Sequence, residues 1–405
     1  MEGESMSEWK ELRAQDFCFH VTDGTHDSPK RTTKGYYLLT SKHIGKDTLN
    51  FESAYKISED DYLKIIERSK VEQYDILYSM IGTIGNVHIV KEDKVNFAVK
   101  NMGIFKFNGD YLHSLWMYYW LKSTKATEYI KSRLSGSTQQ YITLSSLRDF
   151  PISIPEIDIM RLITGILSSL DAKIETNNKL NEKLEEMAQA IFKSWFVDFE
   201  PFKDKPFHET ELGIIPEGWK VVSLCDIANF TNGLAMQKYR PNDDEAYLPV
   251  LKIKELRQGF CDDTSEICTN DISEDYIAED GDVIFSWSGT LLVDIWCGGE
   301  CGVNQHLFKV TSEKYNKWFY YYWIKKHLEE FIRIAKDKTV TMGHIKREHL
   351  RNALVVVPDN KTMHNADKIF SPIINRIIES RIESKRLASL RDTLLPRLMS
   401  GELIV

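Results

Sequence analysis

Two polar segments carry the side chains best suited to binding nucleic acid. THDSPKRTTK at residues 25–34 gathers three basic residues, a histidine and hydroxyls between two apolar runs, and QKYRP at 237–241 joins basic, amide and aromatic side chains. Lysine and arginine bind phosphate oxygens, whereas hydroxyl, amide and imidazole groups bind base edges. Read singly, either segment could be an ordinary solvated loop. The candidate DNA-binding residues here and nearby are Thr25, His26, Lys30, Arg31, Lys34, Lys42, Gln237, Lys238, Tyr239, Arg240, Lys252 and Lys254.

A second pair of polar segments offers further candidates. GSTQQY at 136–141 and DKTVTMGHIKRE at 337–348 are rich in hydroxyl and amide side chains that can bind bases, although helix caps and strand starts use the same residues. Asn304, Gln305 and His306 precede an expected strand and leave the same two interpretations open. From the paired segments we take Thr138, Gln139, Gln140, Thr339, Thr341 and His344 as candidate DNA-binding residues.

The sequence offers no arrangement typical of catalysis. It lacks the GxxxxGK[ST] phosphate loop, the NPP[FY] motif of amino-methyltransferases, HExxH and GxSxG. The six cysteines are scattered without the CxxC spacing of structural zinc sites, so we expect reduced thiols and no metal. We therefore expect a chain without a catalytic site.

Length and composition predict an ordinary globular protein. The 405 residues suffice for two to three domains, and 42% hydrophobic with 28% charged residues is typical of folded chains. We find neither a membrane span nor a signal peptide and expect a cytoplasmic protein. The net charge of -8 argues against indiscriminate binding to phosphates, so any contact with DNA must be local.

The chain repeats itself, which decides its architecture. Trp9-Lys10 and Trp219-Lys220 open two similar segments, and the order of matching blocks is the same in both. YDILYSMIGTIG (74–85) aligns with GDVIFSWSGTLL (281–292), KNMGIFKF (100–107) with VNQHLFKV (303–310), and QQYITLSSLRDFPISIP (139–155) with MGHIKREHLRNALVVVP (342–358). The two basic segments occupy equivalent places in this repeat, which favours a shared role.

Each half ends in a long amphipathic stretch. Residues 160–200 and 366–403 carry apolar residues at helical spacing, and both stretches exceed the average globular helix. Narrow apolar stripes need a partner, so we expect the two helices to pair. Asn177 falls on the heptad series, either as a buried amide that fixes register or as an exposed residue on a rotated seam. The candidate residues for helix pairing and partner docking are Ile163, Leu170, Asn177, Leu184, Ile191, Ile377, Leu387, Leu394 and Leu398.

The repeat predicts an α+β fold built as module, long helix, module, long helix. We expect shorter helices at 112–134 and 317–337, a linker without a sustained period at 199–220, and Pro372 close to the start of the last helix, where proline is tolerated. The expected boundaries are 1–156, 157–206, 207–358 and 359–405.

At this point the chain resembles the specificity subunit of type I restriction-modification systems. The resemblance covers nearly all of it and is carried by NKLNEKLEEMAQAIFKSWFVDFEPF (178–202), LGIIPEGWK (212–220) and LRDTLLPRLMSGEL (390–403), with GTHDSP, SGTLLVDI and VNQHLFKV typical of the family's recognition domains. It implies two duplicated target recognition domains separated by two conserved helices, packed as an antiparallel coiled coil with pseudo-two-fold symmetry.

The resemblance also implies partners and a function. The chain would recognise double-stranded DNA without catalysing a reaction, and each domain would read one half of a bipartite, asymmetric site. Two modification subunits with S-adenosylmethionine would dock on the helices, and two restriction subunits would bring ATP and Mg. Two alternatives remain open from the residues: a structural adaptor that does not read DNA, or a reader that serves a different restriction-methylation enzyme.

Overall fold

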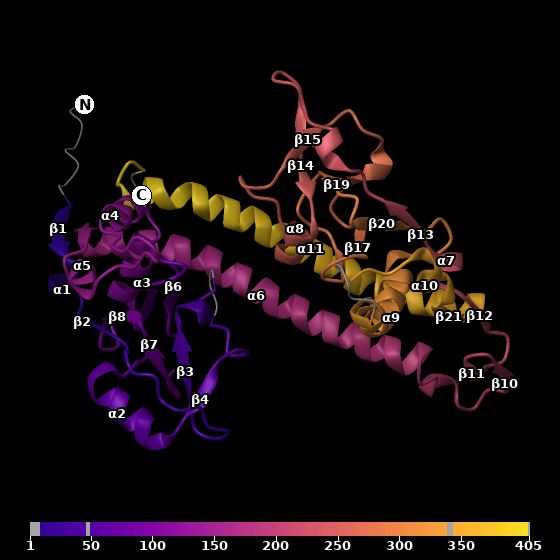
Figure 1. Cartoon of the computed structure of the whole chain (residues 1–405), viewed down its shortest axis with the longest axis horizontal. Coiled ribbons are helices and arrows are strands. Elements are labelled where there is room, and N and C mark those ends of the chain that lie inside the picture. Colours follow the sequence, from indigo (N-terminus) through magenta and orange to yellow (C-terminus); the bar gives the residue numbers. More distant parts are fainter. Residues whose placement is uncertain (1–8, 46–48, 338–342, 404–405) are drawn as a thin grey trace. The chain divides into compact units, whose positions relative to one another are not determined.

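The computed structural model describes residues 9–45, 49–337 and 343–403 (Figure 1). These residues fall into two compact units, one within residues 1–172 and 388–405 and the other within 173–387. Each unit holds a globular part and a share of two long helices. We call the globular parts the first domain and the second domain.

The first domain combines short strands with short helices. Ser58, Ser123 and Thr143 accept hydrogen bonds from backbone amides of the first turns of α2, α4 and α5, which fixes where these helices begin. The elements are β1 (Lys10–Arg13), α1 (Ala14–Phe17), β2 (His20–Asp23), β3 (Tyr36–Thr40), η1 (Ser41–His43), β4 (Tyr55–Ile57), α2 (Glu59–Ser69), β5 (Ile76–Ser79), β6 (Val87–Ile89), β7 (Phe97–Lys100), β8 (Met102–Lys106), α3 (Tyr111–Leu121), α4 (Thr124–Ser132), α5 (Leu144–Arg148) and β9 (Pro151–Ile154).

The second domain follows in nearly the same order. Its elements are β12 (Lys220–Ser223), α7 (Leu224–Ile227), β13 (Asn229–Asn232), η3 (Met236–Lys238), β14 (Tyr247–Leu251), α8 (Ile253–Gln258), β15 (Ile267–Thr269), η4 (Glu274–Tyr276), β16 (Ile277–Ala278), β17 (Val283–Ser286), β18 (Leu292–Ile295), β19 (Cys301–Val303), β20 (Leu307–Thr311), α9 (Lys317–Asp337), α10 (Arg347–Asn352) and β21 (Leu354–Val357).

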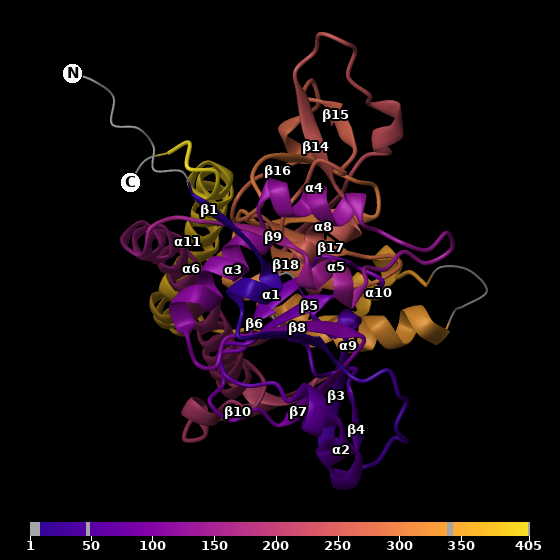
Figure 2. The same cartoon turned by 90° about the vertical axis from the view of Figure 1, so that its left-hand side faces the viewer.

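The two domains share one sheet topology. The first has an antiparallel sheet of order β2-β8-β5-β6, a sheet β4-β3-β7 in which β3 and β7 run parallel, and the pair β1-β9. The second repeats these as β13-β20-β17-β18, β15-β14-β19 with β16 added at the edge, and β12-β21, and β14 runs parallel to β19. Helix α2 lies against the β3 sheet of the first domain, as both views show (Figures 1 and 2). The matching topologies confirm the internal duplication.

Two helices of 40 residues, α6 (Ile157–Phe196) and α11 (Asn360–Met399), pair with each other in both units. In the first unit, the start of α6 packs against the end of α11 through Ile163 and Leu398. In the second unit, the end of α6 packs against the first half of α11 through Phe196 and Phe370. This reversal of order makes the pair antiparallel, and the α+β fold with paired long helices is as predicted.

Two expectations about local structure were wrong, and a third segment holds structure that the sequence did not indicate. The expected helix at 112–134 is interrupted, because α3 ends at Leu121 and the Ser123 side chain begins α4. Helix α11 begins at Asn360 rather than 366, so Pro372 lies inside it. The expected linker at 199–220 contains η2 (Glu200–Phe202) and a hairpin of β10 (Phe207–Thr210) and β11 (Gly213–Pro216), whose four-residue strands are too short to give a clear periodic signal.

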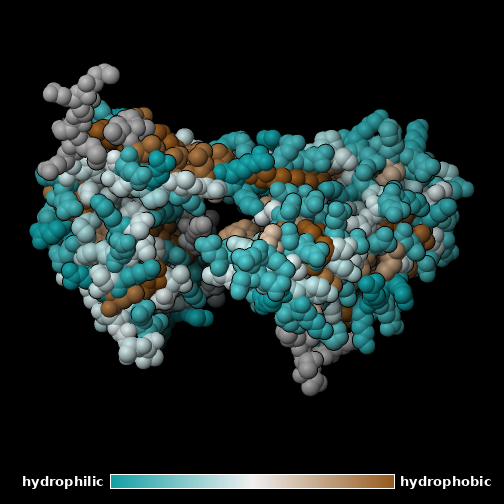
Figure 3. Space-filling model, turned by 90° about the horizontal axis from the view of Figure 1, so that it is seen from above, coloured by the Kyte–Doolittle hydropathy of each residue, from teal (hydrophilic) through white to brown (hydrophobic). Residues whose placement is uncertain are grey.

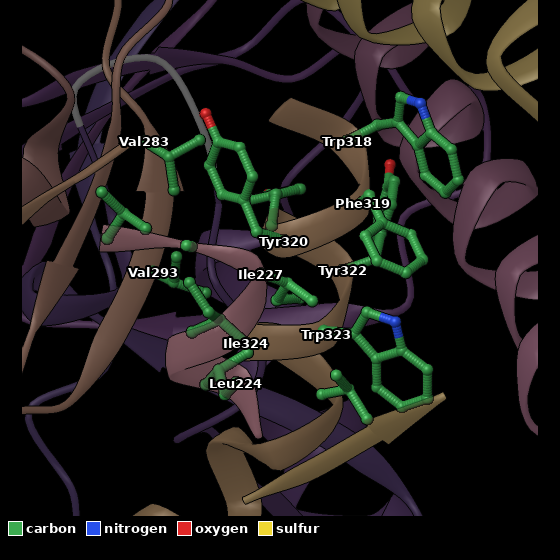
Figure 4. Packing of buried hydrophobic residues seen from close by; sticks show 14 of the residues in the cluster. Leu224, Ile227, Val283, Val293, Trp318, Phe319, Tyr320, Tyr322, Trp323 and Ile324 are labelled. Atoms are coloured by element: carbon green, nitrogen blue, oxygen red, sulfur yellow. The ribbon is translucent and has the colours of Figure 1, made fainter. Parts of the chain in front are cut away.

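Aromatic helices form the centre of each core. In the first domain, the indole nitrogens of Trp116 and Trp120 on α3 donate to the Ser153 and Pro151 carbonyls of β9, at 3.1 and 2.8 Å. Burying side chains of this size stabilises the fold by roughly 1.5–3 kcal/mol each. Figure 4 shows the counterpart in the second domain, where α9 packs against α7 and the β17–β18 strands through Trp318, Phe319, Tyr320, Tyr322, Trp323, Ile324, Leu224, Ile227, Val283 and Val293.

Candidate nucleic-acid interface

The first basic loop follows β2 and is fixed by strand β7. A Cβ added at Gly24 would lie 2.3 Å from the Val99 carbonyl oxygen, so only glycine allows this approach. The Thr25 amide donates to the same carbonyl at 3.0 Å, and its buried hydroxyl accepts from the Asp27 amide at 3.1 Å. Thr25 therefore shapes the loop in this structure, while the exposed side chains beyond it are open to a ligand.

His26 is exposed and held by polar groups that the sequence analysis missed. Its Nε2 lies 2.9 Å from Asp23 Oδ2, and its Nδ1 lies 2.8 Å from Asn101 Oδ1. The other Asp23 oxygen accepts from Arg68 Nη1 at 3.1 Å, although the Asp23 side chain is only 6% exposed. Asn101 and Arg68 are far from His26 in the sequence, so no local pattern could have indicated this network.

The basic side chains of the first domain are exposed. Lys30, Arg31 and Lys34 lie on the loop, and Lys42 lies on η1. The Arg31 guanidinium is 4.9 Å from the centre of the Tyr55 ring, which limits its motion. The exposed cations of this loop therefore suit phosphate contacts.

Thr138, Gln139 and Gln140 are exposed on a tight turn. Ser135 and Tyr141 exchange two backbone hydrogen bonds of 2.9 Å across its base, and Gly136 adopts a φ of +92° within it. Backbone hydrogen bonds thus close the turn, and the three polar side chains stay exposed.

The second basic loop is built in the same way as the first. A Cβ added at Gly233 would lie 2.2 Å from the Val303 carbonyl oxygen, and the Leu234 amide donates to that carbonyl at 2.9 Å. Gln237 and Lys238 are exposed on η3, and Tyr239 is half-buried. The repeated glycine contact explains why both basic segments begin at an equivalent glycine.

Glu266 brings together two candidates from different segments. Arg240 Nη2 donates to one Glu266 oxygen at 2.6 Å, and Lys252 Nζ donates to the other. These hydrogen bonds, that from Lys252 first, lower the pKa of the Glu266 carboxyl. The carboxylate was not among the sequence-predicted residues, and it makes the two cations one cluster.

Lys254 forms a separate polar group beside this cluster. Its Nζ donates to Thr264 Oγ1 at 2.9 Å and lies 3.7 Å from Asp262 Oδ2. Hydrogen bonds from Thr264 lower the pKa of Asp262 to about 2. Like Lys252, Lys254 has an acidic neighbour with which a phosphate would compete.

Of the three candidates in the segment 337–348, the structure describes only His344. His344 forms a β-bridge with Ser288, and its ring stands edge-on to Trp287 with centroids 6.2 Å apart. Thr339 and Thr341 lie outside the described residues. The role of all these candidates in DNA binding stays a prediction.

The candidate helix residues lie along the helix pair. Ile163, Ile377 and Leu398 are buried, and the remaining apolar candidates are half-buried: Leu170, Leu184, Ile191, Leu387 and Leu394. The pair uses these residues in its own packing, and their use in partner docking stays a prediction.

Asn177 is buried in the helix pair rather than exposed on a rotated seam. Its side chain is 1% exposed, and Nδ2 donates to Glu383 Oε2 at 2.8 Å and to the Ser380 carbonyl at 3.4 Å. Asn177 and Ser380 are 203 residues apart, as are the first residues of α6 and α11, Ile157 and Asn360. Equivalent positions of the two helices therefore meet here, and the amide can fix their register.

The described residues hold no group of three or more His, Cys, Asp or Glu side chains that could bind a metal ion. All six cysteines have free thiols. Within the same residues, no helix has the length and apolarity that crossing a membrane requires. Hydrophilic residues cover most of the face shown in Figure 3, in keeping with the abundance of exposed charged side chains.

Comparison with known proteins explains the duplication. The model of the type I restriction modification DNA specificity domain matches the chain twice, over residues 6–186 and 216–389. The chain belongs to this family. It is a DNA-recognition subunit of the type I restriction-modification class, as the two recognition domains and their paired helices also indicate.

Relatives of this specificity family match over most of their length. The chain is 30% identical over 379 residues to the type I restriction enzyme MjaIX specificity subunit of Methanocaldococcus jannaschii, covering 89% of this chain and 86% of the relative. It is 24% identical to the HindI specificity subunit of Haemophilus influenzae, covering 98% and 100%. The crystal structure of the S subunit from M. genitalium shares the fold, with a TM-score of 0.55, 17% identity and 98% coverage of both chains.

Proposed function

We propose that each domain of this specificity subunit reads one half of a bipartite, asymmetric site in double-stranded DNA, and that the paired helices set the gap between the halves. The observation that carries this proposal is one framework used twice with different polar side chains. Gly24 and Gly233 make the same backbone contact, yet the loops that follow carry Lys30, Arg31 and Lys34 in one domain and Gln237, Lys238 and Arg240 in the other. Two similar but unlike readers imply two unlike half-sites.

The proposal assigns chemistry to partner subunits. Two modification subunits would bind S-adenosylmethionine and dock on α6 and α11, and two restriction subunits would bind ATP and Mg. Their basic surfaces would supply part of the phosphate neutralisation that a chain of net charge -8 lacks. The complex would act in the cytoplasm, where its DNA lies.

A test of the helix as spacer is to lengthen it. Inserting four residues after Asn178 in α6 adds about 6 Å of helix, so the gap in the methylated motif should grow by about one or two base pairs while both half-sites persist. The matched control inserts four residues between Glu211 and Leu212, in the turn of the β10–β11 hairpin, and should leave the gap unchanged. Methylation mapping that showed altered half-site letters, or a constant gap with α6 lengthened, would contradict the proposal.

A further inference from the structure

The two domains build one corner of the fold with the same backbone. Ile142 donates to the Met80 carbonyl at 2.9 Å in the first domain, and Ile345 donates to the Trp287 carbonyl at 3.0 Å in the second. The neighbouring bridges match as well, because Ile81 pairs with Tyr141 just as Ser288 pairs with His344. Each corner lies at the end of the central strand, β5 or β17, so the side chains there can be compared directly.

In the first domain this corner is closed by apolar side chains. Met80 and Met102 are buried, and Gly103 leaves room for Leu147, whose Cδ1 would lie 2.4 Å from an added Cβ. Gly103 pairs with Tyr78 and Asp23 in the sheet, so it belongs to the framework of β8. An apolar seal of this kind has no group that could bind the polar edge of a base.

The second domain adds polar and aromatic groups at this corner, beside the buried Leu307 and Phe308 that correspond to Met102 and Gly103. Gln305 stands where the first domain has Asn101, because the backbone amides of both residues donate to the carbonyl that follows the equivalent glycine, that of Leu234 or Thr25. Met102 corresponds to Leu307 in the sheets, so His306 is an extra residue before β20. Its Nδ1 lies 2.9 Å from Ser288 Oγ. The Gln305 amide nitrogen lies 3.5 Å from His306 Nε2, and the Trp287 ring lies 6.0 Å from the His306 ring. All four side chains of the cluster are half-buried: Trp287, Gln305, His306 and His344.

One polar atom of this cluster has no partner among the described residues. Trp287 Nε1 is buried and makes no hydrogen bond to them. Leaving a buried donor unpaired costs about 1–3 kcal/mol, whereas the indoles of Trp116 and Trp120 in the first domain are both paired. Trp219 and Trp323 also have unpaired indole nitrogens, but both lie in the core. Trp287 is half-buried, so an acceptor on a ligand could reach it.

The cluster lies beside the second basic loop. The backbone amide of Gln305 donates to the Leu234 carbonyl at 2.8 Å, and Leu234 forms a parallel bridge with Asn304. The chain then continues from Leu234 directly into Gln237 and Lys238 on η3. Phosphate-binding cations and a base-binding cluster thus share one end of the domain.

We propose that Trp287, Gln305, His306 and His344 form a base-reading cluster of the second domain. The first domain has Met80 in place of Trp287 and no counterpart of His306. The inference rests on the proposed function and adds to it the residues that choose a base. A glutamine amide offers the donor and acceptor that fit adenine N7 and N6 in the major groove. Ser288 holds His306 at Nδ1, so the His306 ring would present a fixed polar edge to the base. The Trp287 ring would provide an apolar surface against which the base can pack.

The test uses the complex of the full chain with its modification subunits and a random library of DNA duplexes. Binding selection followed by sequencing is done for the wild type, for Gln305→Glu and His306→Asn, which preserve size, and for Gln305→Ala. Gln73→Ala and His20→Ala in the first domain serve as matched controls. The expected result is that preference at one or two base pairs of the second half-site falls by about tenfold or more, as for loss of one good side chain–base pair, while the first half-site is unchanged.

The other outcomes are distinct. If the three variants select the wild-type motif, or if both half-sites weaken equally in variants that melt at the wild-type temperature, the cluster does not read bases. If the wild-type complex itself selects no motif, the proposed function fails and the inference fails with it. A variant that melts early is judged by the conservative substitution at the same position.

Discussion

Strand β5 of the first domain leads into Met80 and Ile81, whereas strand β17 of the second leads into Trp287 and Ser288. The residues before these positions are buried in both domains and pair with the same neighbouring strands. The difference shows that the repeat preserves the buried residues that pair within the sheet and varies the side chains that follow the end of the strand. A framework that tolerates such variation allows one protein to carry two unlike binding surfaces.

The domains also attach to α6 by similar contacts of different strength. In the first unit, the Tyr119 hydroxyl donates to Asp171 at 2.7 Å, and Arg391, whose side chain is 7% exposed, donates to the same carboxylate at 2.6 Å. In the second unit, Tyr322 donates to Glu185 at 3.2 Å, and Lys325 pairs with it. The first anchor includes a buried guanidinium, and the second a cation that is 26% exposed.

Exchanging one domain should have the largest effect on specificity. Replacing residues 213–358 by the corresponding segment of another family member should change every specified base of one half-site and leave the other half-site intact, because the strands β12 to β21 pair only with one another. Methylation mapping measures the result. The reciprocal exchange of residues 1–156 is the control, and a change in both half-sites from either exchange would show that the domains do not read independently.

Asp171→Ala should destabilise the first unit more than Glu185→Ala destabilises the second. Removing Asp171 takes a hydrogen-bonded carboxylate from buried Arg391, at an expected cost of about 1.5–3 kcal/mol in unfolding free energy. Tyr119→Phe, which removes only one hydrogen bond, should cost about 1 kcal/mol. Denaturant unfolding measures the free energy of unfolding of each variant. A larger loss in Glu185→Ala than in Asp171→Ala would contradict this comparison.

Neutralising the first basic loop should reduce the salt dependence of DNA binding. With Lys30 and Arg31 both changed to Ala, the slope of log K against log salt should fall by about 1.8 in magnitude if each contacts one phosphate. Lys238→Ala in the second loop should lower it by about 0.9, and Lys131→Ala on α4 should not change it. Equal slopes for the wild-type and Lys30/Arg31 complexes would remove this loop from the interface.

The smallest expected effect is on the loss of stability at acidic pH. Burial lowers the pKa of His327 in the second domain and of His43 in the first below the usual value of 6.5. The unfolded chain then binds these protons more tightly, so the stabilisation is present above about pH 6.5 and is lost as the pH falls through the folded pKa. His327→Gln should flatten the decline in melting temperature of the second unit below pH 6.5, and His20→Gln, at an exposed site on β2, should not. A decline as steep in His327→Gln as in the wild type would contradict this.

The sequence allowed the fold to be predicted where residues repeat or keep a period. The matched blocks predicted two like domains, and the heptad series through Ile163 and Leu184 predicted the long helices. The break between α3 and α4 escaped prediction, because both sides of Ser123 have helical composition and only its capping bond separates them. The hairpin at 207–216 escaped too, since its strands are too short for a period to be seen.

The candidate site was predictable only in its local parts. The exposed cations on the two loops follow from composition, but Glu266 joins Arg240 to Lys252 through contacts across 26 and 14 residues. Asp23 and Arg68 likewise meet across 45 residues. Such networks depend on tertiary packing, which a pattern of neighbouring residues does not contain.

Mapping methylated adenines in a host that carries this chain and its partner subunits tests the central claim most directly. The account predicts one motif of two unlike half-sites separated by a gap of fixed length, which disappears when this chain alone is deleted. A continuous or palindromic motif, or one that persists in the deletion strain, would contradict the claim that two unlike domains of this subunit choose the sequence.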